Sequence, residues 1–186
     1  LARAGFELSV YTRTPEKADR FAAEHNNATA AGSPREAAER ASIVITMVPD
    51  APEVEEVLLG ENGAVHGLAE GALAIDMSTI APTAARAIGE RLGDDGVAFL
   101  EAPVSGSRPK AEDGTLTIMA GGSPAAFERA RPAFDAMGEL IVHVGEVGQG
   151  QLVKVINNAV AAANTTVVAE ALVAGKLAGA DLDALE

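Results

Sequence analysis

A lysine and two adjacent asparagines stand near the start of a long apolar run. Two glycines, Gly148 and Gly150, come shortly before Lys154, Asn157 and Asn158. In a helix, Lys154 and Asn158 are four residues apart and therefore point to one face. Asn is a poor helix former, and two in a row within an Ala- and Val-rich helix oppose local propensity. This combination suggests a site.

Lys154 has the chemistry of a general acid and base. The four residues around it, Leu152, Val153, Val155 and Ile156, are apolar. We therefore expect the ammonium to be partly desolvated, which lowers a lysine pKa. A lysine whose pKa lies nearer to neutrality can give and take protons. The alternative is a solvated surface lysine, the commonest kind on helices.

The elements that must position this lysine alternate between strand and helix. The patterns predict strands at 6–11, 28–31, 43–48, 72–77, 97–100, 116–120 and 140–144, with helices at 15–25, 33–40, 52–59, 82–92 and 124–137. This alternation predicts an α/β fold with a doubly wound, mainly parallel sheet. From 149 towards 175–179 we expect one long helix. We therefore divide the chain into a nucleotide-binding domain, 1–146, and the start of a helical domain, 147–186.

Capping residues mark several helix boundaries. Thr14 precedes a Pro at the first helical position, and Ser33 with Glu36 predicts a capping box. The Ala-Arg-Ala-Gly at 2–5 predicts the end of a helix closed by glycine. At the other end, Asp181 or Asp183 is expected to open a further helix. Both ends of the chain therefore suggest an internal fragment.

Sheets of this class bind ligands beyond the carboxyl ends of their strands. The loops at 12–14, 48–50, 78–80 and 103–107 follow such ends. Arg13 lies where an acidic residue would bind a ribose 2′-hydroxyl; an arginine accommodates a 2′-phosphate instead and favours NADP. The alternative is an ordinary turn arginine. Ser78 and Thr79 could begin the helix at 82–92 or bond a cofactor.

Ser105, Gly106 and Ser107 form a run of small residues whose N–H groups and hydroxyls could hold an anion. A plain turn is an equal alternative. Ser107 and Lys110 have the S-x-x-K spacing of a hydrolase, but we expect no helix there and set that interpretation aside.

Two further site types are excluded by spacing. Gly148 and Gly150 do not complete a dinucleotide fingerprint, because Val153 stands at the third small position and no strand follows. The three histidines are scattered without metal-ligand spacing, so we expect no metal, and the strand residue His143 is expected to be structural.

Composition narrows the function classes. The 14 basic and 27 acidic residues give a net charge of −13, which disfavours nucleic-acid partners. There is no Cys, which excludes disulfides and thiolate catalysis. With no signal-like start and no long uncharged apolar run recognised, we expect a soluble cytoplasmic protein without a membrane partner.

Four segments carry a family resemblance: 10–15, 46–49, 101–107 and 148–158. Together they resemble the β-hydroxyacid dehydrogenases, which include 3-hydroxyisobutyrate dehydrogenase and tartronate semialdehyde reductase. The segments at 59–63, 75–82 and 109–116 are most similar to the tartronate semialdehyde reductases of that family. Glu101 and Ser107 depart from it, since the family motif has Asp and Gly there.

The resemblance implies a Rossmann-type domain followed by the first long helix of an all-α domain. The family's first strand and its G-x-G-x-x-G turn would precede Leu1. By resemblance, Lys154 is the catalytic acid/base, Asn158 orients the substrate, and Ser105 with Gly106 holds its carboxylate. The residues implied to bind the cofactor, NADP or NAD, are Arg13, Val48, Pro49 and Thr79.

The expected activity is NAD(P)-dependent interconversion of a small anionic β-hydroxyacid and its semialdehyde. Reduction of 2-hydroxy-3-oxopropionate (tartronate semialdehyde) to glycerate is favoured, with 3-hydroxyisobutyrate or 4-hydroxybutyrate dehydrogenase as the alternative. A nucleotide-binding module without chemistry is the alternative of another class. The family further implies a homo-oligomer when full length, and we expect the fragment alone to be inactive.

Overall fold

The computed structural model describes residues 1–182. Its strands are β1 (Leu8–Val10), β2 (Ala28–Ala30), β3 (Ile43–Thr46), β4 (Leu73–Asp76), β5 (Ala98–Glu101), β6 (Val104–Ser105), β7 (Leu116–Gly122) and β8 (Gly138–Gly145). Its α-helices are α1 (Pro15–Glu24), α2 (Pro34–Ala38), α3 (Ala51–Leu59), α4 (Pro82–Asp94), α5 (Ser107–Asp113), α6 (Pro124–Asp135) and α7 (Gln149–Leu177). Two short 3₁₀ helices, η1 (Ala2–Ala4) and η2 (Ala64–His66), complete the described elements. The expected helix around Asp181 and Asp183 runs into 183–186, which lie outside the described residues.

The strands form one six-stranded sheet and one two-stranded sheet. In the larger sheet β3, β4 and β5 are parallel neighbours, β7 runs antiparallel to β5, and β8 runs parallel to β7. The strands β1 and β2 pair in parallel as a separate sheet. The predicted α/β fold with a mainly parallel sheet is therefore confirmed.

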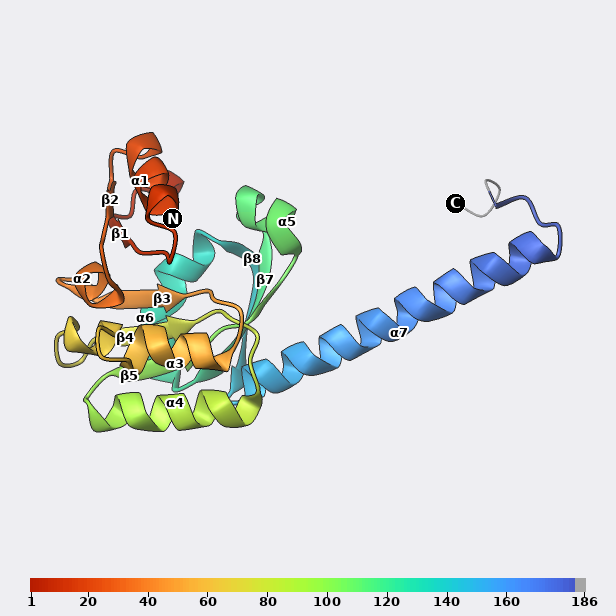
Figure 1. Ribbon diagram of the computed structural model, residues 1–186. Coiled ribbons are helices and arrows are strands. Elements are labelled where there is room, and N and C mark those ends of the chain that lie inside the picture. Colours follow the sequence, from red (N-terminus) through yellow and green to blue (C-terminus); the bar gives the residue numbers. More distant parts are fainter. Residues whose placement is uncertain (183–186) are drawn as a thin grey trace.

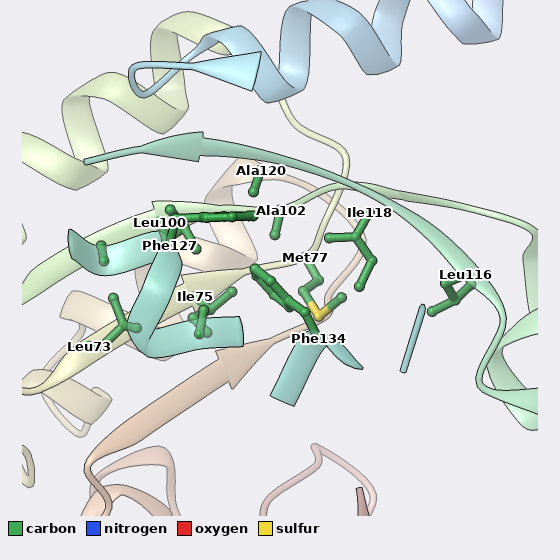
Figure 2. Packing of buried hydrophobic residues seen from close by; sticks show 12 residues of the cluster. Leu73, Ile75, Met77, Leu100, Ala102, Leu116, Ile118, Ala120, Phe127 and Phe134 are labelled. Atoms are coloured by element: carbon green, nitrogen blue, oxygen red, sulfur yellow. The ribbon is translucent and has the colours of Figure 1, made fainter. Parts of the chain in front are cut away.

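Alternating residues of the central strands bury opposite faces of the larger sheet. Leu73 and Ile75 of β4 pack on one face with Phe127 and Phe134 of α6, as Figure 2 shows. Ala74, between them, packs on the other face with residues of α3 and α4. This period of two is what a strand buried on both faces requires. The sheet is thus a rigid platform covered on both sides.

The short strand β6 continues β5 past the edge of the parallel strands. Leu100 and Glu101 pair with Gly122 and Gly121 of β7, and Ser105 pairs with Thr117. These pairs share one antiparallel register. In the same register, the Met119 N–H donates to the Pro103 carbonyl at 3.0 Å. Residues 98–105 therefore form one extended segment along β7, interrupted around Pro103, which has no N–H to donate.

The helix α7 leaves the sheet and extends away from it (Figure 1). Its buried residues are confined to the first turns: Gly150, Gln151 and Lys154. Ile156, Val160 and Val167 further along are more than half exposed. By length and composition α7 could also cross a membrane. We had expected no apolar run long enough to do so. Core helices of water-soluble proteins pass the same test, so this property assigns no membrane.

Several local predictions are confirmed. Gly5 closes η1 with φ 86°, and the Ser33 hydroxyl accepts from the Glu36 N–H at 3.1 Å. His143 is structural as expected: its Nε2 donates to the Gly122 carbonyl at 2.7 Å and its ring stacks on Phe127.

Other local predictions are wrong. The Glu36 carboxylate accepts from the Gly32 N–H rather than closing the capping box at Ser33. Ser78 and Thr79 do not cap α4, whose N-cap position is Ala81. We expected no helix at Ser107, but α5 begins there. Pro109 is compatible with this helix because it lies in the first turn, where a missing N–H costs no hydrogen bond.

Candidate active site

The carboxyl ends of three parallel strands meet at one edge of the larger sheet. Thr46 of β3 pairs in register with Asp76 of β4, which pairs in register with Glu101 of β5. All three side chains are buried. The loops that follow such strand ends form the ligand sites of open α/β sheets.

Asp76 joins the loops that follow β3 and β4. Its Oδ1 accepts from the Thr46 hydroxyl at 2.8 Å and from the Ser78 N–H at 3.2 Å. The Ser78 hydroxyl in turn accepts from the Val48 N–H at 2.9 Å. These bonds place Val48 beside the segment that carries Thr79. Two of the sequence-predicted cofactor residues are therefore brought to neighbouring loops.

The first turn of α7 is fixed to the same edge. Gln151 is fully buried, its Oε1 accepts from the Ile80 N–H at 3.1 Å, and its Nε2 donates to the Ser78 carbonyl at 2.8 Å. Glu101 Oε1 accepts from the Gly148 and Gln151 N–H groups at 2.7 and 3.2 Å. The helix that carries Lys154 therefore starts in contact with the loop that carries Thr79.

Lys154 is buried, with 8% of its surface exposed, and this burial lowers the pKa of its ammonium. The predicted cause was the apolar neighbours on its own helix, but Val155 and Ile156 are 46% and 55% exposed. The burial instead comes from packing of the α7 start on the sheet, where Gly150 and Gln151 are also buried. Among the described residues, the Lys154 ammonium has no hydrogen-bond or ion-pair partner, so it remains able to bind a ligand.

The remaining predicted substrate residues lie apart from these bonds. Asn158 is exposed one turn beyond Lys154, and Asn157 is exposed beside it. Ser105 is half-buried in β6, and Gly106 leads into α5. Within the described part of the chain, no hydrogen bond joins Lys154 to Ser105 or to Asn158.

The turn after Ser105 has a left-handed backbone. Gly106 has φ 132° and Ser107 has φ 56°. Ser107 stands where the family motif has glycine, and a non-glycine residue in this region is strained. Backbone N–H groups in a turn of this kind can contact an anion.

The cofactor residues are divided between the two sheets. Thr79 and Pro49 are exposed and Val48 is half-buried beyond the larger sheet, whereas Arg13 is exposed after β1 of the smaller sheet. In the described structure, the Thr79 hydroxyl and the Arg13 guanidinium form no hydrogen bond with the protein. Val48 and Thr79 offer an apolar side chain and a hydroxyl at the larger sheet, and Arg13 offers a cation at the smaller sheet. These groups suit a ligand that has a ring at one end and a phosphate at the other.

The buried carboxyl pair and Gln151 were not among the predicted site residues. Asp76 Oδ2 and Glu101 Oε2 are buried and have no hydrogen-bond partner among residues 1–182. Burial raises the pKa of Asp76, and burial together with the neighbouring Asp76 charge raises the pKa of Glu101. The available signal was an acidic residue closing each of two apolar strands, at Asp76 and Glu101. Nothing local distinguishes Gln151 from a surface glutamine.

Two surface hollows of the described structure do not belong to this site. Both lie on the exposed part of α7 and are lined by residues of this helix alone, between Asn164 and Leu177. A hollow on one helix without an opposing wall cannot enclose a substrate.

Comparison with known proteins shows the family to which the chain is similar. Residues 1–145 match the family model of the NAD binding domain of 6-phosphogluconate dehydrogenase. The chain is 41% identical over 181 residues to the 2-hydroxy-3-oxopropionate reductase of Escherichia coli K12, covering 97% of this chain and 61% of that protein. It is also 41% identical over 185 residues to the NAD-dependent L-serine dehydrogenase of Pseudomonas aeruginosa, covering 100% and 61%.

A solved structure has the same fold. The crystal structure of 3-hydroxyisobutyrate dehydrogenase from Salmonella typhimurium superposes with a TM-score of 0.86 and 33% identity, covering 98% of this chain and 64% of that one. The chain thus spans about three fifths of the length of the curated relatives it matches.

The buried carboxyl pair generates a prediction about pH. Because both pKa values are raised on folding, the folded protein keeps these protons to higher pH than the unfolded chain does. Their contribution to the free energy of unfolding is therefore largest in acid and declines as pH rises past about 4, until both carboxyls have ionised in the folded state. Asp76→Asn cannot ionise and keeps an oxygen for Thr46 and Ser78. We expect its stability relative to the parent to increase with pH.

Urea unfolding at steps between about pH 4 and pH 8 measures this difference. Asp19→Asn on the exposed face of α1 is the control and should show no such trend. A stability difference for Asp76→Asn that stays constant across this range would contradict the prediction.

Proposed function

Because the chain belongs to the β-hydroxyacid dehydrogenase family, with an NAD-binding domain of the 6-phosphogluconate dehydrogenase type, we propose that the full-length protein is an NAD(P)-dependent oxidoreductase. It interconverts a small anionic β-hydroxyacid and its semialdehyde. The observation that carries this proposal is a buried lysine with a lowered pKa, held where α7 starts on the carboxyl edge of the sheet. A nucleotide-binding module without chemistry would have no need of such a lysine.

Lys154 is the proposed acid and base. When bound, the nicotinamide supplies the hydride for reduction or accepts it in oxidation. As the carbonyl carbon is reduced, negative charge builds on the carbonyl oxygen; the Lys154 ammonium stabilises that charge and then protonates the oxygen. In the oxidative direction the neutral amine removes the hydroxyl proton. Desolvation lowers the pKa of Lys154 and so favours the neutral amine, the form that accepts the proton in the oxidative direction.

The remaining residues orient the substrate. Asn158, one turn after Lys154 on α7, is proposed to donate its amide N–H to the same oxygen. Ser105 and the left-handed turn at Gly106 are proposed to bind the carboxylate, which aligns the carbonyl for reaction. Most of the rate enhancement then comes from positioning.

The proposed cofactor contacts follow from the two sheets. Val48, Pro49 and Thr79 are proposed to contact the nicotinamide end, beside the start of α7. Arg13 is proposed to pair with the 2′-phosphate of NADP, since its guanidinium is exposed after β1. We further propose a cytoplasmic homo-oligomer, with no nucleic acid, membrane or metal as a partner.

The substrate proposed first is 2-hydroxy-3-oxopropionate, reduced to glycerate. The sequence segments that resemble tartronate semialdehyde reductases support this choice, as does the 41% identity to one such enzyme. Equal identity to an L-serine dehydrogenase makes L-serine a necessary member of the test panel. The panel compares kcat/KM of the full-length protein for these two compounds, 3-hydroxyisobutyrate and 4-hydroxybutyrate. We expect the highest value for 2-hydroxy-3-oxopropionate; a higher value for another member would reassign the substrate.

Lys154→Ala should lose turnover. We expect kcat to fall by about 100-fold or more, since general acid–base catalysis contributes about that much, while cofactor binding is retained. Steady-state kinetics and cofactor titration measure the two effects separately. Lys176→Ala, an exposed lysine on the same helix, is the control and should keep parental kinetics. Near-parental turnover of Lys154→Ala would refute the catalytic assignment.

Arg13→Asp should change cofactor preference. A hydrogen bond to a charged group contributes roughly 1.5–3 kcal/mol, so we expect the NADPH to NADH ratio of kcat/KM to fall by about tenfold or more. Arg20→Asp, an exposed arginine on α1, makes the same change in charge without lying at the strand end. If both variants leave the ratio unchanged, Arg13 is a surface residue and the proposed NADP preference loses its basis.

A further inference from the structure

Glu101 caps a helix that begins almost fifty residues later in the chain. Its side chain is fully buried at the end of β5. Its Oε1 accepts from the Gly148 N–H at 2.7 Å and from the Gln151 N–H at 3.2 Å. The first N–H groups of a helix have no partner within the helix, and a carboxylate there is favoured by the helix dipole. The carboxylate of β5 therefore fixes the start of α7.

Two glycines leave room for this carboxylate. A Cβ at Gly121 would lie 2.6 Å from Glu101 Oε1, and a Cβ at Gly150 would lie 3.1 Å from the same oxygen. A side chain at Gly121 would therefore displace the carboxylate, and one at Gly150 would crowd it. Because neither glycine has a side chain, the backbones of β7 and of the first turn of α7 approach each other closely around the Glu101 carboxylate.

Gln151 adds a second attachment in the same turn. Its amide group bonds both Ser78 and Ile80, so the turn is tied to the loop after β4 as well as to β5. Two attachments in different directions fix both the rotation of α7 and its position along its axis. A single attachment would leave the rotation free.

Lys154 lies one turn beyond these attachments. It is four residues after Gly150 and three after Gln151, so it lies on the same face of α7. Long side chains on a helix lean towards its N-terminus, and the stem of Lys154 therefore covers the turn that Glu101 fixes. Any rotation of this turn moves the ammonium.

We propose that Glu101 is a positioning residue for Lys154: through its bonds to the first turn of α7, it sets where the ammonium lies relative to the loop that carries Thr79. This inference rests on the proposed function only in assigning catalysis to Lys154. The positioning itself can be measured without turnover. Glu101 would act on catalysis through Lys154 and not by contact with the substrate.

Glu101→Met tests the proposal in the full-length protein, because it nearly keeps the size of the side chain and removes the oxygen that accepts from the Gly148 and Gln151 N–H groups. We expect amide hydrogen exchange in 148–154 to become about tenfold faster while β4 and β5 stay protected. We expect acylation of Lys154, followed by peptide mass spectrometry with Lys176 as the internal reference, to become faster by a similar factor. We expect kcat to fall with little change in KM, and Glu101→Asp to recover most of it, since it restores a carboxylate.

Asp76→Asn is the matched control for exchange and acylation, because it removes an equally buried carboxyl from the neighbouring strand that bonds no residue of α7. The proposal is overturned if Glu101→Met leaves exchange and acylation at parental rates, or if Asp76→Asn changes them equally. If Lys154→Ala keeps turnover, the proposed function fails, and the exchange and acylation results still decide whether Glu101 positions Lys154.

Discussion

The contact on which this structure depends is between the first turn of α7 and the end of the sheet. Gly121 and Gly150 both lie against Glu101 Oε1, so closely that a Cβ added at either glycine would press on this oxygen. No other residue type permits this approach without displacement. The place of α7, and with it that of Lys154, therefore follows from two glycines and one carboxylate that are far apart in the chain.

This arrangement reduces stability in return for fixed geometry. Two neighbouring carboxyls are buried, and one oxygen of each has no partner within the described part of the chain. Burying a carboxylate is unfavourable unless hydrogen bonds compensate, and here the N–H groups of α7 and the hydroxyl of Thr46 compensate only in part. Sequences that oppose local stability in this way do so most often at functional sites. The burial of Glu101 is consistent with that pattern.

Much of the fold could be predicted from the sequence because its signals are local. Apolar runs gave the central strands, Pro and Ser gave helix starts such as Ser33, and Gly148 preceded α7 as expected. The lowered pKa of Lys154 was also predicted, although its cause was not, since the apolar neighbours on α7 are exposed. Burial on a sheet depends on tertiary packing, which periodicity within one helix does not contain.

The parts that could not be predicted depend on residues distant in sequence. Gln151 bonds Ser78 across 73 residues, and the bond leaves no pattern near either residue. The segment that contains β6 was expected to be a loop, yet its pairing with β7 continues past Pro103. The helix α5 was not expected either, although Pro109 in its first turn is compatible with a helix start.

The pairing of β6 with β7 has a consequence for any molecule that binds at Ser105. A residue in an ordinary connecting loop samples many conformations and must become ordered when a ligand arrives, which weakens the association. Ser105 is already held in a ladder opposite Thr117. A ligand there would meet a preorganised surface, and any closing movement that shields it from water would have to come from another element.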